Sequence, residues 1–291
     1  MNKYSMFCKK LSQDIPKPQF FCYTKIAVSK DFTIPEMEIS ISNTCNLRCK
    51  ECGFLIPHQP KPTLSENIIQ EHIKCLEILL KTGVKINSLA ILGGEPTLNP
   101  SLLEKAVRTL SDLDGIEQLE VVTNGLNPSG FTKRTLEKIQ KISVSVYVDD
   151  NEFISLWEKF IDRNAPHIKL AFRIQKPWDI NTGTKIISDE EAQKFFENCW
   201  YKKHCVTIER SRLFLCSIAP KHLSDDDGLL LDENTSAEEI YKYLNGNKPL
   251  EYCKRCVPQM KLGKVPAGKQ SDGVNLLKLI ERAKCFLNLT D

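Results

Sequence analysis

Long apolar segments are missing from this 291-residue sequence, since none approaches the about 20 residues that a helix needs to cross a bilayer. An excess of one charge is missing too, because 40 Lys and Arg are balanced by 37 Asp and Glu. The net charge of +3 is too small and too dispersed to favour a nucleic-acid-binding surface. The first residues lack the apolar core of a secretory signal. These absences predict a cytoplasmic protein with neither a membrane nor a nucleic-acid partner.

Cysteine, by contrast, is abundant, with twelve residues in the chain. Because disulfides are rare in the cytoplasm, such a number of cysteines there favours metal binding or redox chemistry. Eight of them form two groups, a short one in the first quarter of the chain and a looser one in the last third. The groups are Cys45, Cys49 and Cys52, and Cys199, Cys205, Cys216, Cys253 and Cys256.

The first group has the spacing C-x3-C-x2-C and directly follows a strand-like run at 37–42. Three thiolates this close together can reach one soft metal centre. On a [4Fe–4S] cluster they would leave one iron without a protein ligand, open to a substrate or cofactor. A zinc knuckle and unligated core cysteines are the alternatives at this point.

Strand-like and helix-like segments alternate from residue 36 to residue 174. This alternation predicts a parallel sheet with right-handed crossovers, either barrel-like or doubly wound. The carboxyl ends of its strands, where such folds build their sites, carry cysteine, glycine and polar residues. The predicted strands are 37–42, 86–92, 119–123, 142–148 and 167–174, and the predicted helices are 66–81, 102–113, 132–140 and 153–163.

The regular alternation of strand-like and helix-like segments ends after residue 174. The pattern predicts a hairpin over 205–216 that turns near Arg210, with a cysteine at each outer end, and helices over 189–198, 237–244 and 274–287. We therefore expect an irregular lead-in (1–35), an α/β domain (36–180) and a small cysteine-rich domain (181–291).

Three motifs at successive strand ends carry a family resemblance. The C-x3-C-x2-C loop, Gly93-Gly94-Glu95-Pro96 and Thr123-Asn124-Gly125 together resemble the radical S-adenosylmethionine (radical SAM) enzymes. The resemblance implies a partial (β/α)5–6 TIM-like barrel, with Cys45, Cys49 and Cys52 holding a catalytic [4Fe–4S] cluster that chelates S-adenosylmethionine. The residues it implies for binding that cofactor are Gly93, Gly94, Glu95, Asn124, Ser145 and Arg173.

Glu95, Ser145 and Arg173 each have an alternative role. The two glycines would let the backbone approach the methionine moiety. Glu95 would accept from its ammonium group or, alternatively, cap the next helix. Ser145 and Arg173 have a structural alternative. One position departs from the family, because Glu51 stands before the third cysteine, where an aromatic residue often packs near the adenine.

The five later cysteines resemble the auxiliary-cluster domains called SPASM and, in shorter form, twitch. Five thiols cannot fill two complete sites, so the resemblance implies one auxiliary [4Fe–4S] cluster. We assign it to Cys205, Cys216, Cys253 and Cys256, with Cys199 in place of Cys205 as the nearest alternative. Structural zinc in this tail is the competing interpretation, since four-cysteine sites serve both metals.

The resemblance implies a reaction class. Reductive cleavage of S-adenosylmethionine, fed by flavodoxin or ferredoxin, would give a 5′-deoxyadenosyl radical that abstracts hydrogen from a small-molecule substrate. The compact tail resembles dehydrogenases that oxidise a sugar or aminocyclitol alcohol. Alternatives are an epimerase in which Cys199 or Cys205 returns a hydrogen atom, a maturase of ribosomal peptides, and a non-catalytic zinc- or cluster-binding scaffold. By position alone, a base for the hydroxyl proton is sought among His58, Tyr147, Asp149, Arg173, Glu209 and Arg210.

Overall fold

The computed structural model describes residues 32–59, 66–174, 177–183, 185–222, 227–271 and 273–289. Most of the predicted lead-in, and with it Cys8 and Cys22, lies outside these ranges. The helices are α1 (Glu66–Lys81), α2 (Pro100–Ser111), α3 (Lys133–Lys138), α4 (Asn151–Asn164), α5 (Asp189–Glu197), α6 (Tyr201–His204), α7 (Ala237–Leu244), α8 (Val257–Met260) and α9 (Leu276–Leu289). The strands are β1 (Thr33–Ser42), β2 (Lys85–Gly93), β3 (Ile116–Thr123), β4 (Lys141–Val146), β5 (Lys169–Ile174), β6 (Trp178–Asp179), β7 (Val206–Glu209), β8 (Arg212–Phe214), β9 (Leu229–Leu230) and β10 (Lys264–Val265).

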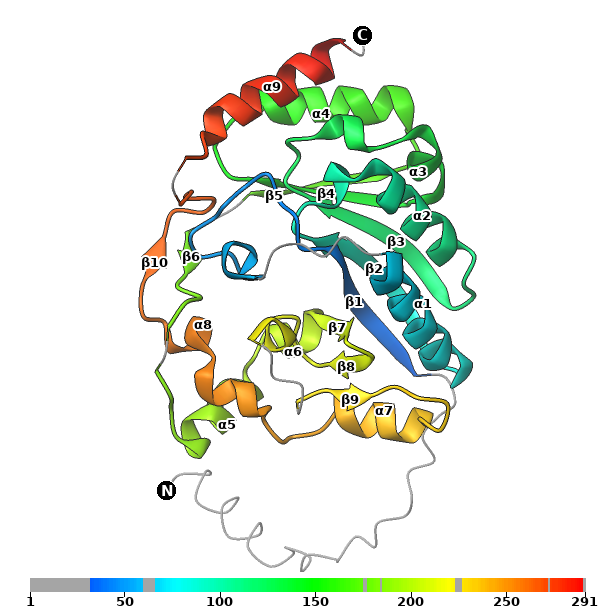
Figure 1. Ribbon diagram of the computed structural model, residues 1–291, viewed down its shortest axis with the longest axis vertical. Helices are drawn as coiled ribbons and strands as arrows, with labels where there is room; N and C mark the ends of the chain where they lie inside the picture. Colours follow the sequence, from blue (N-terminus) through cyan, green and yellow to red (C-terminus); the bar gives the residue numbers. More distant parts are fainter. Residues whose placement is uncertain are drawn as a thin grey trace, which may run out of the picture.

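The α/β prediction is confirmed. Strands β1 to β5 are parallel neighbours in sequence order, each joined to the next by one of α1 to α4, which cover one face of the sheet (Figure 1). The apolar side of each helix packs there on buried strand residues such as Ile39, Leu89 and Val121. This is a partial β/α barrel with all five strand ends, and so the three predicted motifs, along one edge.

Strand β1 is longer than predicted. It begins at Thr33 rather than Met37, because its first residues pair with β2 through Thr33 with Lys85 and Ile34 with Ile86. Pro35 lies inside this strand although it has no N–H to donate. The predicted lead-in of residues 1–35 therefore ends a few residues too late.

The predicted hairpin forms, and it extends the main sheet. Strand β7 pairs in parallel with β1, and β8 and β9 follow, which gives the order β5-β4-β3-β2-β1-β7-β8-β9. The turn residues Arg210 and Ser211 both have positive φ, 49° and 56°, as a two-residue hairpin turn of right-handed twist requires. One sheet thus runs through both segments that we expected to be separate domains.

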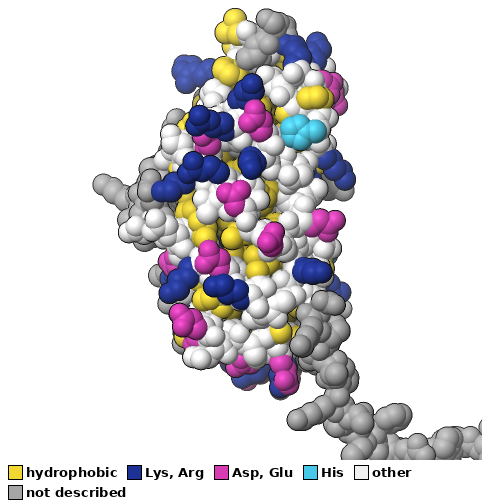
Figure 2. Space-filling view, turned by 90° about the vertical axis from the view of Figure 1, so that its right-hand side faces the viewer, with side chains coloured by type: hydrophobic (Ala, Val, Ile, Leu, Met, Phe, Trp, Pro, Cys, Tyr) yellow, Lys and Arg dark blue, Asp and Glu magenta, His cyan; other side chains and the backbone are white. Residues whose placement is uncertain are grey.

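The end of the chain returns to the barrel. Helix α9 packs along α4, and Lys284 of α9 pairs with Asp150 and Glu152 at the start of α4 at 2.8 and 2.9 Å (Figure 1). Lysine and acidic side chains are interspersed on the face that carries α1 to α3, without a patch of one sign (Figure 2). Among the described residues, no helix has both the length and the apolarity to cross a membrane.

Candidate active site

The loop that carries Cys45, Cys49 and Cys52 leaves the carboxyl end of β1 and is held from outside by the distant tail of the chain. Cys49 and Gln270 form an isolated antiparallel β-bridge. On either side of it, Lys50 N–H donates to the Lys269 carbonyl and Ser271 N–H donates to the Arg48 carbonyl, both at 2.8 Å. The sequence contained no signal for this contact, which joins segments about 220 positions apart.

Amide side chains donate to two of the loop's sulfur atoms. Asn124 Nδ2 lies 3.8 Å from Cys45 Sγ, and Gln270 Nε2 lies 3.3 Å from Cys49 Sγ. Burial raises the pKa of Cys45 to about 12 and that of Cys49 to about 11, and it raises the pKa of Cys52. The thiols are therefore neutral without metal. A metal must displace their protons, whereas the amide donors favour the sulfur once it is a thiolate.

The donor set is three free thiols in one loop, which fits a [4Fe–4S] cluster because such a cluster takes each thiolate on a separate iron. Cys45, Cys49 and Cys52 are the residues that would hold it, with one iron left open.

Gly93 and Gly94 bring β2 against the cysteine loop. A Cβ on Gly93 would meet the Ser42 carbonyl oxygen at 2.2 Å, and one on Gly94 would meet the Thr44 oxygen at 2.1 Å. The amides of Gly94 and Glu95 donate to these same two oxygens at 2.8 and 2.7 Å. The close approach that we expected toward the cofactor is thus made, in the first place, toward the loop backbone. Contact with the methionine moiety stays a prediction.

Glu95 is 1% exposed and joins the second motif to the third. Its Oε1 accepts from Thr97 N and from the Thr97 and Thr123 hydroxyls at 3.1, 2.7 and 2.8 Å, and Oε2 accepts from Asn124 N at 2.7 Å. The capping alternative is therefore observed, on the short helical turn Pro96–Leu98. A bond to an ammonium group at Oε2 is a prediction beside it.

Asn124 completes the link between the three motifs. Its Nδ2 donates to Asn46 Oδ1 at 2.7 Å, inside the cysteine loop. Ser145 and Arg173 stand opposite each other on β4 and β5. Ser145 is buried and hydrogen bonds with Tyr147, whereas exposed Arg173 acts electrostatically on Glu38 of β1. Their contacts with S-adenosylmethionine stay predictions.

Glu51 has a structural role. Its carboxylate accepts from Asn181 N and Thr182 N at 2.9 and 3.0 Å and from the Thr182 hydroxyl, while Asn181 Nδ2 donates to the Glu51 carbonyl at 2.9 Å. The residue that replaces an aromatic side chain in this motif therefore fastens the segment that leads into the cysteine-bearing tail.

Four of the tail cysteines interact with one another electrostatically. Cys216, Cys253 and Cys256 each lie within electrostatic range of Cys199, and Gln259 Nε2 lies 3.9 Å from Cys199 Sγ. Burial raises the pKa of Cys253 to about 12, that of Cys256 to about 11 and that of Cys216 further. These four thiols are the predicted alternative set, with Cys199 in place of Cys205.

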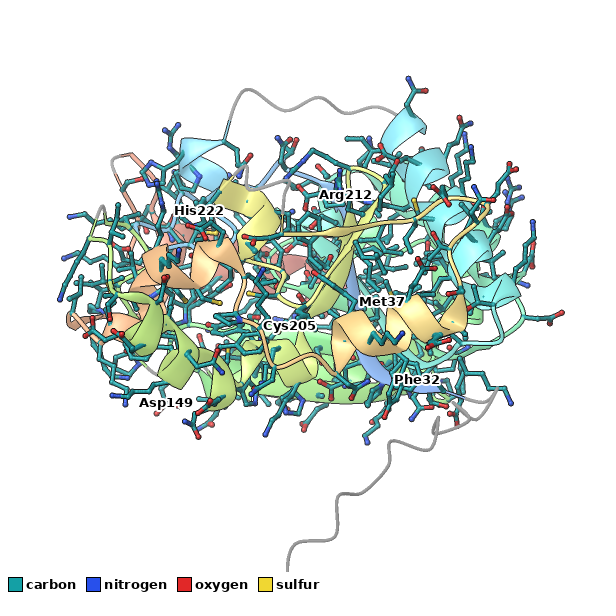
Figure 3. All side chains as sticks on the ribbon, turned by 90° about the horizontal axis from the view of Figure 1, so that it is seen from below. Phe32, Met37, Asp149, Cys205, Arg212 and His222 are labelled. Carbon is teal, nitrogen blue, oxygen red and sulfur yellow. The ribbon has the colours of Figure 1, made fainter. Side chains whose placement is uncertain are left out.

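Cys205 has other partners. Its thiol donates to the Glu38 carboxylate and also hydrogen bonds with Ser217, and burial raises its pKa. It lies near the middle of the view in Figure 3, away from exposed Asp149. Cys205 also lies within electrostatic range of Cys216, so the predicted set of Cys205, Cys216, Cys253 and Cys256 and its alternative with Cys199 both stay predictions.

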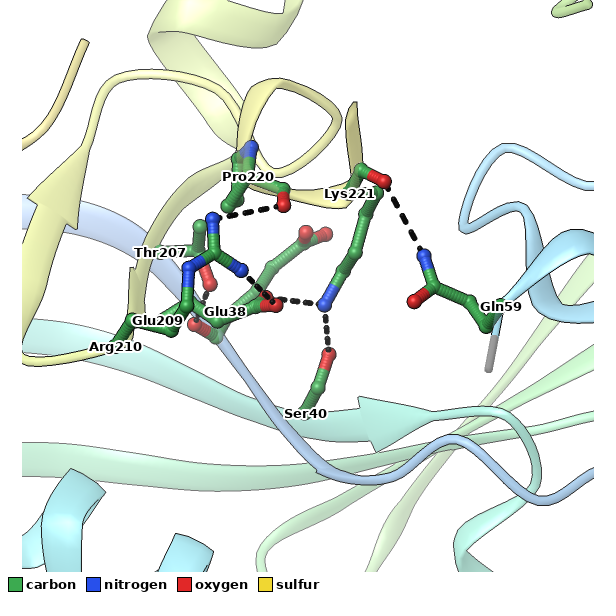
Figure 4. A network of polar contacts seen from close by, with 8 residues as sticks. All are labelled: Glu38, Ser40, Gln59, Thr207, Glu209, Arg210, Pro220 and Lys221. Carbon is green, nitrogen blue, oxygen red and sulfur yellow. Dashed lines mark hydrogen bonds and ion pairs between the residues drawn. The ribbon is translucent and has the colours of Figure 1, made fainter. Parts of the chain in front are cut away.

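Three titratable residues that the sequence analysis did not single out interact electrostatically, since Lys221 lies within range of both Glu38 and His72. Lys221 pairs with Glu209 and donates to Ser40 Oγ at 3.2 Å, and Arg210 pairs with Glu209 at 3.1 Å (Figure 4). The alternation M-E-I-S-I-S could have revealed Glu38 and Ser40, because its polar residues share one face of β1. Among the base candidates, His58 and Asp149 are exposed.

His72 should make stability depend on pH. Burial lowers the pKa of His72 to about 4, against an ordinary value of about 6.5. The charge of Lys221 also lowers this pKa, whereas the charges of Glu209 and Glu71 raise it. Between these pH values the unfolded chain binds a proton that the folded protein does not, so stability falls as pH falls. We expect wild type to lose about 3 kcal/mol more than His72→Gln between pH 7 and 4. Urea unfolding across this range measures it, and parallel curves for the two proteins would contradict it.

Comparison with known proteins agrees with this site. Residues 39–151 match the profile of the Radical SAM superfamily. This segment contains the cysteine loop and the second and third motifs, so the similarity to the radical SAM superfamily rests on residues 39–151.

Curated relatives resemble the same part of the chain. GTP 3',8-cyclase of Staphylococcus haemolyticus is 28% identical over 130 residues, which cover 41% of this chain and 36% of the relative. GTP 3',8-cyclase of Aquifex aeolicus is 32% identical over 38% of this chain and 34% of its own length. Human molybdenum cofactor biosynthesis protein 1 is 32% identical over 38% of this chain and 16% of its own. The chain thus matches about a third or less of these relatives.

Two solved structures are similar over more of the chain at low identity. The crystal structure of BtrN in complex with AdoMet and 2-DOIA is 14% identical and covers 84% of this chain and 100% of BtrN, with a TM-score of 0.46. Native anSMEcpe with bound AdoMet and the Cp18Cys peptide is 14% identical and covers 88% of this chain and 100% of its own, with a TM-score of 0.39. At these values no residue role is transferred from either.

Proposed function

We propose that this radical SAM enzyme oxidises an alcohol carbon of a small polar substrate, a sugar or cyclitol, to a ketone. In that reaction the carbinol carbon loses one hydrogen atom to the 5′-deoxyadenosyl radical, the hydroxyl loses a proton to a base, and one electron leaves. When bound, the cluster on Cys45, Cys49 and Cys52 with S-adenosylmethionine supplies the radical, and a cluster on the tail cysteines supplies the electron acceptor.

The electrostatic proximity of four tail cysteines supports this proposal. Cys216, Cys253 and Cys256 each lie within electrostatic range of Cys199, and the described cysteines are free thiols. A second cluster would provide the electron sink that a net oxidation needs. The twitch-like character of the tail and a flavodoxin or ferredoxin donor belong to the same proposal.

A radical epimerase is the second candidate, and Cys205 favours it. This thiol is buried, stands outside the proposed four-cysteine set and donates to Glu38 on the inward face of β1. An epimerase needs a thiol that returns a hydrogen atom to the substrate radical, and it releases no electron. A maturase of ribosomal peptides finds no such specific support here. The GTP 3',8-cyclase relatives are matched over only about a third of their length, so their activity is not proposed for this chain.

The functions separate in one experiment on protein prepared without oxygen and reconstituted with iron and sulfide. Wild type, given reductant, S-adenosylmethionine and a panel of sugars and cyclitols in deuterium oxide, should form 5′-deoxyadenosine and ketone in equal amounts. Cys199→Ser should lose about four irons and form 5′-deoxyadenosine without ketone, whereas Cys205→Ser should keep its iron and its ketone. Deuterium incorporated at carbon without oxidation, and lost in Cys205→Ser, would establish the epimerase instead. Zinc in the wild-type tail would refute the oxidation.

A further inference from the structure

A slot opens where β1 and β7 separate. The two strands pair only from Met37 with Val206 to Ile39 with Ile208, and beyond that point Ser40 and Ser42 diverge from Glu209 and Arg210. A cavity of about 230 Å³ lies there at the carboxyl edge of the sheet. It is lined by residues that include Gly93 of the second motif and Phe54, two positions after Cys52, so it adjoins the radical SAM site.

The charges in the slot already neutralise one another. Glu209 pairs with both Lys221 and Arg210, Lys221 also donates to Ser40, and Arg210 Nη2 donates to the Pro220 carbonyl at 3.0 Å (Figure 4). A phosphate or carboxylate ligand would need cations that are not committed to a neighbouring carboxylate. The slot therefore suits a ligand without acidic groups that exchanges hydrogen bonds with neutral and paired side chains.

One buried acceptor in the slot lacks a partner. His72 is 2% exposed, its ring hydrogen bonds with the Ile208 backbone, and its Nδ1 has no partner among the described residues. Leaving such an atom unsatisfied costs about 1–3 kcal/mol, so a hydroxyl that donates to it would bind with a net gain. His72 lines the same cavity as Ser40 and Lys221.

One side of the slot is apolar, although Asn43, Gln59 and Glu71 also line it, and the space is small. Phe54, Ile56 and Ile68 form the apolar side, and Lys221 Nζ stands 5.3 Å from the centre of the Phe54 ring. Pockets for drug-sized ligands measure about 300–1,000 Å³, so this slot fits a single small ring. An apolar face beside hydrogen-bonding groups matches a saturated ring, whose C–H bonds point one way and whose hydroxyls point outward.

We propose that this slot binds the substrate, and that the substrate is a single polyhydroxylated ring without phosphate or carboxylate groups. His72 Nδ1 accepts from one hydroxyl, Ser40 and the Lys221–Glu209 pair hydrogen bond with others, and Phe54 covers the ring face. This assignment rests on the proposed function, to which it adds the class of substrate and the residues that select it.

Binding without reductant tests the slot separately from the reaction. Reconstituted wild type is titrated with myo-inositol, glucose, glucosamine and GTP, and the dissociation constants are measured by saturation-transfer NMR. At least one polyol should bind and GTP should not compete. His72→Gln should weaken binding about threefold to tenfold, and Lys221→Met about tenfold or more. Lys141→Met is the matched control, because Lys141 makes a comparable pair with Glu120 at 2.8 Å away from the slot.

Melting temperatures establish which variants are folded, and Ser40→Ala replaces Lys221→Met if the latter is not. The assignment is overturned if no polyol binds, if GTP binds in place of a polyol, or if both slot variants bind as tightly as the control. A protein that binds a polyol through these residues but forms no 5′-deoxyadenosine when reduced would keep the slot and lose the proposed function. If wild type forms a ketone from a polyol and the slot variants form it equally well, the proposed function stands and the slot assignment is wrong.

Discussion

Replacing Cys45, Cys49 and Cys52 together by alanine is expected to abolish cleavage of S-adenosylmethionine and to lower the iron content from about eight to about four per chain. The three thiols stand in one loop, and two of them receive amide donors, Cys45 from Asn124 and Cys49 from Gln270. Their loss removes one cluster. The tail site involves none of them, so its iron should stay.

The measurement is iron, sulfide and zinc content on protein reconstituted without oxygen, together with 5′-deoxyadenosine formed under reducing conditions. Cys75→Ala is the matched control, because Cys75 is a buried cysteine of α1 outside both cysteine groups, and it should keep about eight irons. About four irons in wild type with zinc in the tail would remove the second cluster and the preferred reaction. Zinc alone, without cleavage, would reject the enzyme.

Gly94→Ala is expected to cost on the order of 3 kcal/mol of stability and to lower iron incorporation in the first loop. An added Cβ would stand 2.1 Å from the Thr44 oxygen and 2.5 Å from its carbonyl carbon, both backbone atoms that no side-chain rotation can move away. Relief requires β2 to draw back from the cysteine loop, which breaks the Glu95 N to Thr44 O bond of 2.7 Å.

Gly53→Ala provides the comparison for this substitution. It makes the same chemical change one residue after Cys52, where an added Cβ meets no atom within 4 Å. It should shift the free energy of unfolding by less than about 0.5 kcal/mol and leave iron content unchanged. Urea unfolding and iron analysis of both variants decide the matter, and equal effects of the two would contradict the packing role of Gly94.

The sequence by itself determined the elements and the motifs, because their information is local. Helix α1 occupies the predicted 66–81 since its apolar residues recur every three or four positions, and the hairpin turns at Arg210 and Ser211 as expected. The alternation of strands and helices placed the cysteine, glycine and asparagine motifs on one edge, because parallel strands share the direction of their carboxyl ends.

Only the tertiary structure decided what these motifs touch. Pairing of β7 with β1, the bridge from Cys49 to Gln270 and the return of α9 to α4 join residues more than a hundred positions apart, and nothing in a local pattern encodes such a partner. The same holds for the tail thiols. Spacing predicted Cys205 as a ligand at a hairpin end, whereas its hydrogen bond with Glu38 and its proximity to Cys216 follow from packing, on which burial and neighbouring charges depend.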